Sequence, residues 1–589
     1  MFFIVISNYF GVLAPQVTGY IIKFVQRNLP GSNATAENGS YASLTNLFIN
    51  WVEGLKNLAP IQVVLLAGVV ILILALLRGF FMFLMRQTII VMSRHIEYDQ
   101  KNEVFDHYQK LDATFYKTHS TGDLMSRMAE DVSRVRMFTG PAIMYFINLV
   151  TLIGMSVFFM LKRDVELTLY VLAPLPILAV TIYIVNNVIH KKSEELQAAL
   201  GQLTTTAQQS YSGIRVIKSF VQEKAMYNAF EQASEKYRSN AASLAKVEAM
   251  YFPSMTLLIG LSTLLTIMVG GIYYINGHKE IGIDTIVEFV IYINMLTFPV
   301  SAIGWTASMI QRASASQKRL NEFLHTKPSI SSPVSPAPHI ALSGDIKLQN
   351  VSFTYEHTSI QAIKNLSLHI RSGERIAVVG RTGSGKTTLV QLILRLYDVS
   401  EGKLLLDDIP IDKIDLATLR GQMSYVPQDG FLFSDTVAAN IAFGSKWMDK
   451  EKVQEAAKLA VVNKDIEGFA KAYETEIGER GVTLSGGQKQ RISIARGLLK
   501  EAPIMIFDDC LSAVDARTEK EIITNLAGYL RHKTSIFITH RVFNLFQFDK
   551  IIVLEEGELK EEGTHDELMQ KRGIYFSMYQ RQLQEESRT

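Results

Sequence analysis

The sequence predicts two linked parts: an all-α membrane domain of six spanning helices with long cytoplasmic helical extensions, and an α/β domain with a phosphate-binding loop. Three observations predict this fold class. Six long apolar segments fill the first half, a proline- and serine-rich stretch follows, and short β-rich runs then alternate with helical patterns around a glycine-rich loop. We therefore expect a membrane domain at 1–324, a linker at 325–343 and an α/β domain at 344–589.

The composition of the chain supports this division. Of 589 residues, 48% are hydrophobic, which is high for a soluble enzyme, while the net charge is only +2. A near-neutral chain lacks the basic excess of a nucleic-acid-binding protein, so we expect no nucleic-acid partner. Cys510 is the only cysteine, which excludes an internal disulfide and a cysteine-based metal site.

The six apolar segments each approach the ~20 residues that cross a bilayer. The first begins at once, without the basic region or cleavage site of a signal peptide, and therefore indicates a spanning helix. The expected spans are 2–25, 59–85, 138–161, 165–188, 252–275 and 284–306.

Two long stretches between the spans, 86–137 and 189–251, are charged but keep helical periodicity. We expect spans two to five to continue through them as a helical stalk. Basic residues flank its membrane ends, namely Arg86, Arg94, Lys191 and Lys192, and favour a cytoplasmic stalk. Lys162 and Arg163 in the opposite loop dilute this signal, so the topology rests mainly on the site in the α/β domain described below.

Two acidic residues, Asp284 and Glu288, begin the sixth span. We expect both to lie at the outer headgroup level, with contact between Glu288 and a transported substrate as the alternative. In the preceding loops, Asn33 and Asn38 each start a glycosylation sequon, a pattern that is common by chance.

A glycine-rich loop follows the strand-like segment 375–379 and precedes a helical segment. In this context the backbone N–H groups of the loop and the helix N-terminus can hold phosphates. We expect Lys386 to neutralise the β- and γ-phosphates and the Thr387 hydroxyl to bind Mg²⁺. The candidate nucleotide-binding residues of the loop are Gly380, Thr382, Gly383, Ser384, Gly385, Lys386, Thr387 and Thr388.

An apolar strand, Ile504–Phe507, ends in two carboxylates, Asp508 and Asp509. In enzymes with such a loop, the first carboxylate holds Mg²⁺. The two motifs together predict that the domain binds a nucleoside triphosphate with Mg²⁺.

The segment Leu484-Ser485-Gly486-Gly487-Gln488 then narrows the choice among nucleotide-binding folds. With it, the chain resembles the ATP-binding cassette (ABC) transporters over essentially its whole length. The resemblance implies an adenine-stacking Tyr355, a Mg²⁺-binding and catalytic Gln428 and a catalytic His540. It also implies a D-loop over 512–515, with Asp515 among the nucleotide-binding residues. It also covers the stretch 475–481.

The membrane half resembles the exporter branch of this family, whose subunits carry six spans before their own cassette. The segments 116–136 and 210–223 resemble the two coupling-helix regions that face the cassettes. The resemblance implies a dimer in which two cassettes sandwich two ATP molecules. Ser485, Gly486, Gly487 and Gln488 would then contact the ATP held by the partner, and hydrolysis would drive transport across the cytoplasmic membrane.

One residue departs from the family pattern. Active members carry glutamate after the first carboxylate, whereas this chain has Asp509. Aspartate is one methylene shorter, so its carboxylate lies ~1–1.5 Å farther from the attacking water. The combination with an intact Leu484–Gln488 segment resembles the impaired-site subunit of heterodimeric exporters. We expect a heterodimer with one slow site, a homodimer with slower hydrolysis being the alternative.

The cargo cannot be read from the motifs. The spans are mostly apolar, which favours an amphiphilic or hydrophobic drug, lipid or peptide from the surrounding membrane lipid. Two other classes are an ATP-gated channel or regulator, and a soluble cassette ATPase, against which the six spans argue. The elbow helix that usually precedes the first span in the family is not seen at the start of this sequence.

Overall fold

The computed structural model describes residues 1–29, 41–54, 59–276, 281–337, 341–445, 447–478, 484–540 and 548–586. Both sequons lie outside these residues. The chain divides into two compact units. One comprises Met1–Tyr108 and Gly122–Thr326, and the other comprises Gln109–Thr121 and Lys327–Thr589. The short segment 109–121 thus belongs with the α/β unit.

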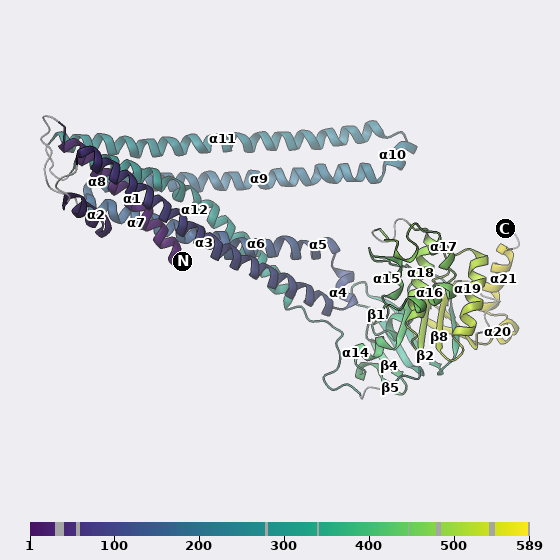
Figure 1. Ribbon diagram of the computed structural model, residues 1–589. Coiled ribbons are helices and arrows are strands. Elements are labelled where there is room, and N and C mark those ends of the chain that lie inside the picture. Colours follow the sequence, from purple (N-terminus) through teal and green to yellow (C-terminus); the bar gives the residue numbers. More distant parts are fainter. Residues whose placement is uncertain are drawn as a thin grey trace. The chain divides into compact units, whose positions relative to one another are not determined.

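The first unit is entirely helical (Figure 1). Within the described residues it has six helical stretches long and apolar enough to cross a membrane, as predicted. Its helices are α1 (Phe2–Arg27), α2 (Ser43–Gly54), α3 (Pro60–Lys110), α5 (Thr121–Ser126), η1 (Arg127–Asp131), α6 (Val132–Met137), η2 (Phe138–Ala142), α7 (Ile143–Arg163), α8 (Val165–Leu172), α9 (Pro174–Ser212), α10 (Ile214–Ser219), α11 (Glu223–Ile275) and α12 (Ile283–Leu324).

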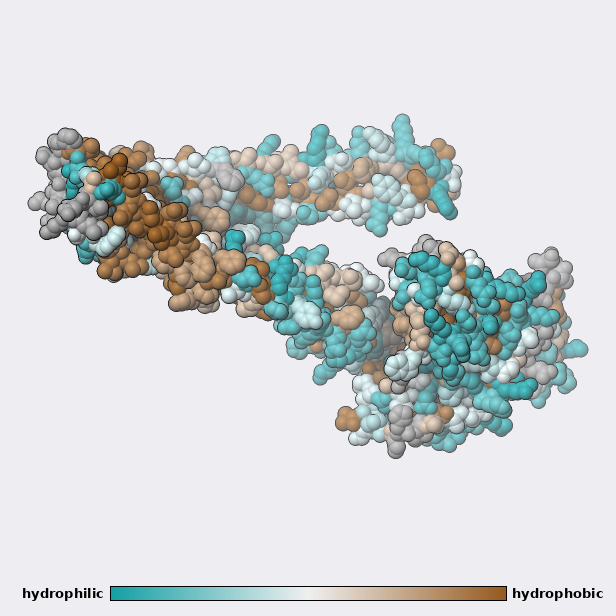
Figure 2. Space-filling model, viewed as in Figure 1, coloured by the Kyte–Doolittle hydropathy of each residue, from teal (hydrophilic) through white to brown (hydrophobic). Residues whose placement is uncertain are grey.

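The extended stalk helices are present, and α9 and α11 run side by side to the short α10 (Figure 1). Their surface changes from hydrophobic to hydrophilic along the unit, as expected for helices that leave a bilayer (Figure 2). The sixth span also continues, since α12 is 42 residues long. This extension was not predicted, and it carries the helix through residues 307–324 beyond the apolar span.

The acidic pair at the start of α12 is not solvated at a headgroup level. Asp284 and Glu288 are both 2% exposed and lie beside the buried Arg163 at the end of α7. Arg163 pairs with Asp284, and its Nε lies 3.7 Å from Glu288 Oε2. The expectation that these charges are inexpensive at the headgroup level was therefore wrong, because both are buried in the protein beside Arg163, which lies 121 positions before Asp284.

The second unit contains two sheets. An antiparallel sheet has the order β2-β1-β4-β5, and a six-stranded sheet has the order β10-β9-β3-β8-β7-β6, in which only β10 is antiparallel. The strands are β1 (Ile346–Tyr355), β2 (Ile360–Ile370), β3 (Arg375–Val379), β4 (Glu401–Leu406), β5 (Ile409–Pro410), β6 (Met423–Val426), β7 (Ile504–Asp508), β8 (Thr534–Thr539), β9 (Lys550–Glu555) and β10 (Glu558–Gly563).

Helices cover one face of the larger sheet, and helix α13 (Lys386–Ile393) together with the antiparallel sheet packs on the other, so its central strands are buried throughout. In β7, for example, Ile504 and Ile506 pack into one core while Met505 and Phe507 pack into another. The helices are α4 (Ala113–Thr118), α13 (Lys386–Ile393), η3 (Ile411–Lys413), α14 (Leu416–Gly421), α15 (Val437–Ala442), α16 (Lys450–Leu459), α17 (Asn463–Glu467), η4 (Ala472–Glu474), α18 (Gly486–Leu499), α19 (Ala516–Tyr529), α20 (His565–Lys571) and α21 (Ile574–Glu586).

Candidate nucleotide-binding site

The parallel strands of the larger sheet end together. Val379 at the end of β3 pairs with Thr539 of β8, and Asp508 at the end of β7 pairs with Ile538. Four of the predicted site segments therefore follow this same edge of the sheet. They are the loop 380–385, the carboxylates 508–509, Gln428 after β6 and His540 after β8. This carboxyl edge is where open α/β sheets bind their ligands.

The glycine-rich loop leads into α13, as its sequence predicts. Gly385 has φ +96°, and a Cβ there would lie 2.5 Å from the carbonyl oxygen of Ala362, so only glycine fits at this turn. The Lys386 ammonium lies over the loop and donates to the carbonyl oxygens of Gly380 at 2.8 Å and Arg381 at 2.9 Å. The loop thus places a cation where phosphate oxygens would replace these carbonyls.

Burial of Lys386 lowers its pKa to about 8, although the nearby Asp509 and Asp508 act in the opposite direction. The ammonium is consequently easier to deprotonate than an exposed lysine at alkaline pH. An anionic ligand in the loop would favour the protonated form.

The two carboxylates have different environments. Asp508 is 1% exposed and accepts from the Thr387 hydroxyl and the Tyr425 hydroxyl, each at 3.2 Å. Burial raises the pKa of Asp508, and these two hydrogen bonds partly offset the rise. Asp509 instead accepts from Gln428 Nε2 at 3.1 Å. The structure therefore forms two hydrogen-bonded pairs on consecutive carboxylates, Thr387 with Asp508 and Gln428 with Asp509.

Thr387 and Asp508 offer oxygen ligands of the kind that Mg²⁺ prefers. The Thr387 hydroxyl and an Asp508 carboxylate oxygen are adjacent, and Mg²⁺ commonly uses one or two such ligands together with water and phosphate oxygens. Among the described residues there is no group of three or more His, Cys, Asp or Glu side chains suited to a metal ion. A cation here would thus depend on the nucleotide for part of its coordination.

Tyr355 stands at the end of β1, beside the loop. Its hydroxyl lies 3.1 Å from Thr388 Oγ1 and donates to Gln391 Oε1 at 3.0 Å. The Lys117 ammonium of α4 lies 4.7 Å from the centroid of its ring, close enough for a cation–π interaction. Lys117 carries no signal in the sequence, since only the tertiary packing of 109–121 brings it to this ring.

The segment 485–488 begins α18. Ser485 and Gln488 form a capping box there, and Gln488 Nε2 also donates to Asp465 at 3.0 Å. The neighbouring Asp515 caps α19 by accepting from the Thr518 amide. No hydrogen bond joins 485–488 to the loop 380–388 in the ranges that the structure describes. The chain therefore does not unite these two predicted parts of the site.

His540 is exposed at the end of β8, and its neighbours 541–547 lie outside the described residues. Of the stretch 475–481, only 475–478 is described. The placement of His540 at the carboxyl edge agrees with the other residues, but none of its contacts assigns it a role.

Comparison with known proteins identifies relatives of both units. A model of the ABC transporter transmembrane region matches residues 1–300, and a model of the ABC transporter domain matches 363–512. The chain is 36% identical to the "Probable multidrug resistance ABC transporter ATP-binding/permease protein YheI" of Bacillus subtilis, over 82% of each chain. It is 36% identical to the "Multidrug resistance-like ATP-binding protein MdlA" of Escherichia coli, over 81% of each.

A solved structure is similar over almost the entire length. It is that of a bacterial Atm1-family ABC exporter with ATP bound, and it aligns with a TM-score of 0.73 and 25% identity over 98% of both chains. The likeness therefore extends across both units.

Proposed function

Since this chain belongs to the ABC transporter family, with a six-span membrane region preceding its own ATP-binding cassette, we propose that it is one subunit of a dimeric exporter. The dimer couples ATP hydrolysis to the export of an amphiphilic or hydrophobic compound. In this proposal residues 1–324 form the membrane domain, 325–343 the linker and 344–589 the cassette.

The observation that carries the dimer is the separation of two half-sites within one chain. Lys386, Asp508 and Gln428 gather at the sheet edge, while Ser485 begins a helix that has no hydrogen bond to that group among the described residues. A second cassette in head-to-tail orientation supplies the missing half. Ser485, Gly486, Gly487 and Gln488 then meet the γ-phosphate held by the partner, at the favourable N-terminus of α18.

The bound nucleotide is held by three kinds of contact. Tyr355 stacks on adenine, the backbone of 380–388 and Lys386 hold the phosphates, and Thr387, Asp508 and Gln428 hold Mg²⁺. When bound, Mg²⁺ neutralises charge on the phosphate oxygens. Thr387 Oγ1 and Asp508 Oδ1 already lie 3.2 Å apart, which supports the assignment of these two residues to Mg²⁺.

Asp509 makes the site on this chain slow. A catalytic carboxylate must hold the attacking water within hydrogen-bond reach, and a displacement near 1 Å can lower the rate about a hundredfold. Gln428 holds Asp509 in place at 3.1 Å, so the shorter side chain cannot simply move forward without losing this bond. The intact segment 484–488 completes a faster site on a different partner subunit, which favours a heterodimer.

Closure of the cassettes moves the stalk helices. The tip of the α9–α11 hairpin carries exposed apolar side chains, including Val216, Phe220 and Val221 at 61%, 71% and 79% exposure. Such residues in a cytoplasmic stalk support a protein contact there, and we assign it to the cassette of the partner subunit. ATP then favours the closed state because only that state joins both half-sites.

A comparison of two substitutions tests this proposal. The chain is purified with its co-purifying subunit, and MgATP hydrolysis is measured for Ser485→Arg and for Lys386→Ala. In a heterodimer, Ser485→Arg removes the fast site and most of the turnover, whereas Lys386→Ala removes only the slow site. Equal loss in both variants would contradict the asymmetric arrangement and indicate two equivalent sites.

A further inference from the structure

The first unit contains a cavity of about 420 Å³ between α9, α11 and α12. Pockets of this size accommodate small organic ligands. Its walls include the aromatic side chains Tyr183, Tyr251 and Trp305, together with several amides and a guanidinium group. The apolar walls expected from hydropathy are thus only part of the lining.

The polarity of the cavity changes along the helices. Both α9 and α12 run from the outer end of a span towards the stalk, so residue number increases with approach to the cytoplasm. The outer wall consists of aliphatic residues such as Ile182 and Val300. Amides follow at Asn186 and Asn187, and the inner end is lined by polar and basic residues, namely His190, Ser193, Ser308, Gln311 and Arg312.

The polar groups of this lining are open to a ligand. Within the described residues, the side chains of Asn186, Asn187 and Gln311 make no hydrogen bond, and the Arg312 side chain makes only a 3.4 Å bond from Nε to the Ser308 carbonyl. Gly304 lets Asn186 lie against α12, since a Cβ there would be 2.2 Å from Asn186 Nδ2.

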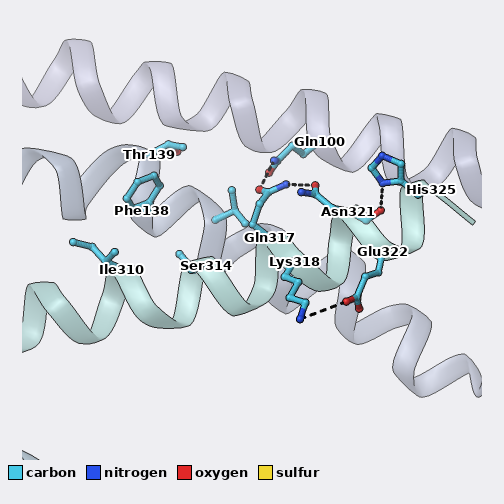
Figure 3. A pocket seen from close by; sticks show the side chains of 12 residues that line it. Gln100, Phe138, Thr139, Ile310, Ser314, Gln317, Lys318, Asn321, Glu322 and His325 are labelled. Atoms are coloured by element: carbon cyan, nitrogen blue, oxygen red, sulfur yellow. Dashed lines mark hydrogen bonds and ion pairs between the residues drawn. The ribbon is translucent and has the colours of Figure 1, made fainter.

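A larger groove of 860 Å³ between α3, η2 and α12 has a different character (Figure 3). Its polar side chains bond to one another: Gln317 to Gln100 and Asn321, and Lys318 to Glu322 (Figure 3). These groups are already engaged, so this groove offers a ligand fewer free polar partners than the cavity does.

Apart from its tyrosines, the cavity lining has only basic titratable side chains. It includes Arg312 and His190 but no aspartate or glutamate. Glu194, outside the lining, lies 3.5 Å from His190 and offsets it when that histidine is protonated. Arg312 therefore leaves the lining with a positive charge that attracts anions and repels cations.

We propose that this cavity binds an anionic amphiphile, with its acidic group at Arg312 and its apolar body between the aromatic and aliphatic walls. The inference deepens the proposed export function by naming a substrate class, and it rests on that function. The polarity gradient fixes the orientation: the apolar part points into the bilayer and the anion towards the cytoplasm.

Equilibrium binding of two probes of opposite charge tests the proposal. The full chain, with Trp51→Phe and Trp447→Phe, keeps Trp305 as its only tryptophan and is placed in phosphatidylcholine nanodiscs without nucleotide. Energy transfer from Trp305 is followed to 11-(dansylamino)undecanoate or to the matched dansylaminoundecyl-trimethylammonium. We expect the anion to bind about tenfold more tightly, as one charge-assisted contact implies.

Three variants locate the origin of the preference. Arg312→Gln should abolish it and Arg312→Lys should retain it. Lys191→Gln should leave it unchanged, because Lys191 is on α9 but outside the lining. Tighter binding of the cation, a preference that survives Arg312→Gln, or a signal that never saturates would each overturn the proposal. ATP hydrolysis by the same preparations is a separate readout, so these results would leave the proposed function standing.

Discussion

The buried cluster of Arg163, Asp284 and Glu288 makes a strong prediction for stability. Arg163 side-chain exposure is 4%, and those of the two carboxylates are 3% and 2%. Replacing Arg163 by methionine leaves two buried carboxylates close together without a cation. Breaking a buried pair in this way costs about 3–5 kcal/mol of unfolding free energy. The triple variant Arg163→Met, Asp284→Asn, Glu288→Gln removes every charge and should lose far less.

The unfolding free energy can be measured by titrating dodecyl sulfate into mixed micelles and following tryptophan fluorescence. Arg238→Ala is the control, since its partner Glu235 and Arg238 itself are 58% and 78% exposed, and exposed pairs contribute little. A single Arg163→Met variant as stable as the wild type, or a triple variant as unstable as the single one, would refute the reasoning from buried charge.

Two further predictions concern the cassette and the membrane domain. Because the pKa of Lys386 is lowered to about 8, its ammonium is lost as pH rises, so the apparent affinity for MgATP should fall about tenfold between pH 7 and pH 9. Lys386→Arg should remove this pH dependence in a fluorescent-nucleotide titration, and a flat wild-type profile would contradict it. Gly140→Ala should cost about 1–3 kcal/mol, because its Cβ would lie 2.7 Å from Ser93 Oγ. Adding Ser93→Gly should recover most of the loss in thermal unfolding, and no recovery would exclude this clash.

Hydropathy was sufficient to find the six spans, because each apolar segment is a local property of the chain. The phosphate loop could also be predicted, since a strand, a glycine loop and a helix are adjacent in sequence. The ion cluster could not, because Arg163 and Asp284 are 121 positions apart. An acidic residue near a span end looks solvated until its partner is known.

The same limit applies to the functional surfaces. Lys117 contacts the Tyr355 ring only because the segment 109–121 packs with the cassette, and no sequence pattern predicts that contact. The polar end of the cavity could not be predicted, because Asn186 and Arg312 come from different helices and neither forms part of a sequence motif. The extension of α12 to Leu324 was missed because only the loops between spans two and five were read as stalk.

The most direct test of the account is the steady-state ATPase rate of this chain purified alone in lipid, beside Asp509→Glu and a Lys386→Ala blank. We expect activity near the blank for the natural chain and a large gain on Asp509→Glu, since the longer carboxylate reaches the attacking water. Robust hydrolysis by the unaltered chain would contradict the slow site and make the protein a working homodimer.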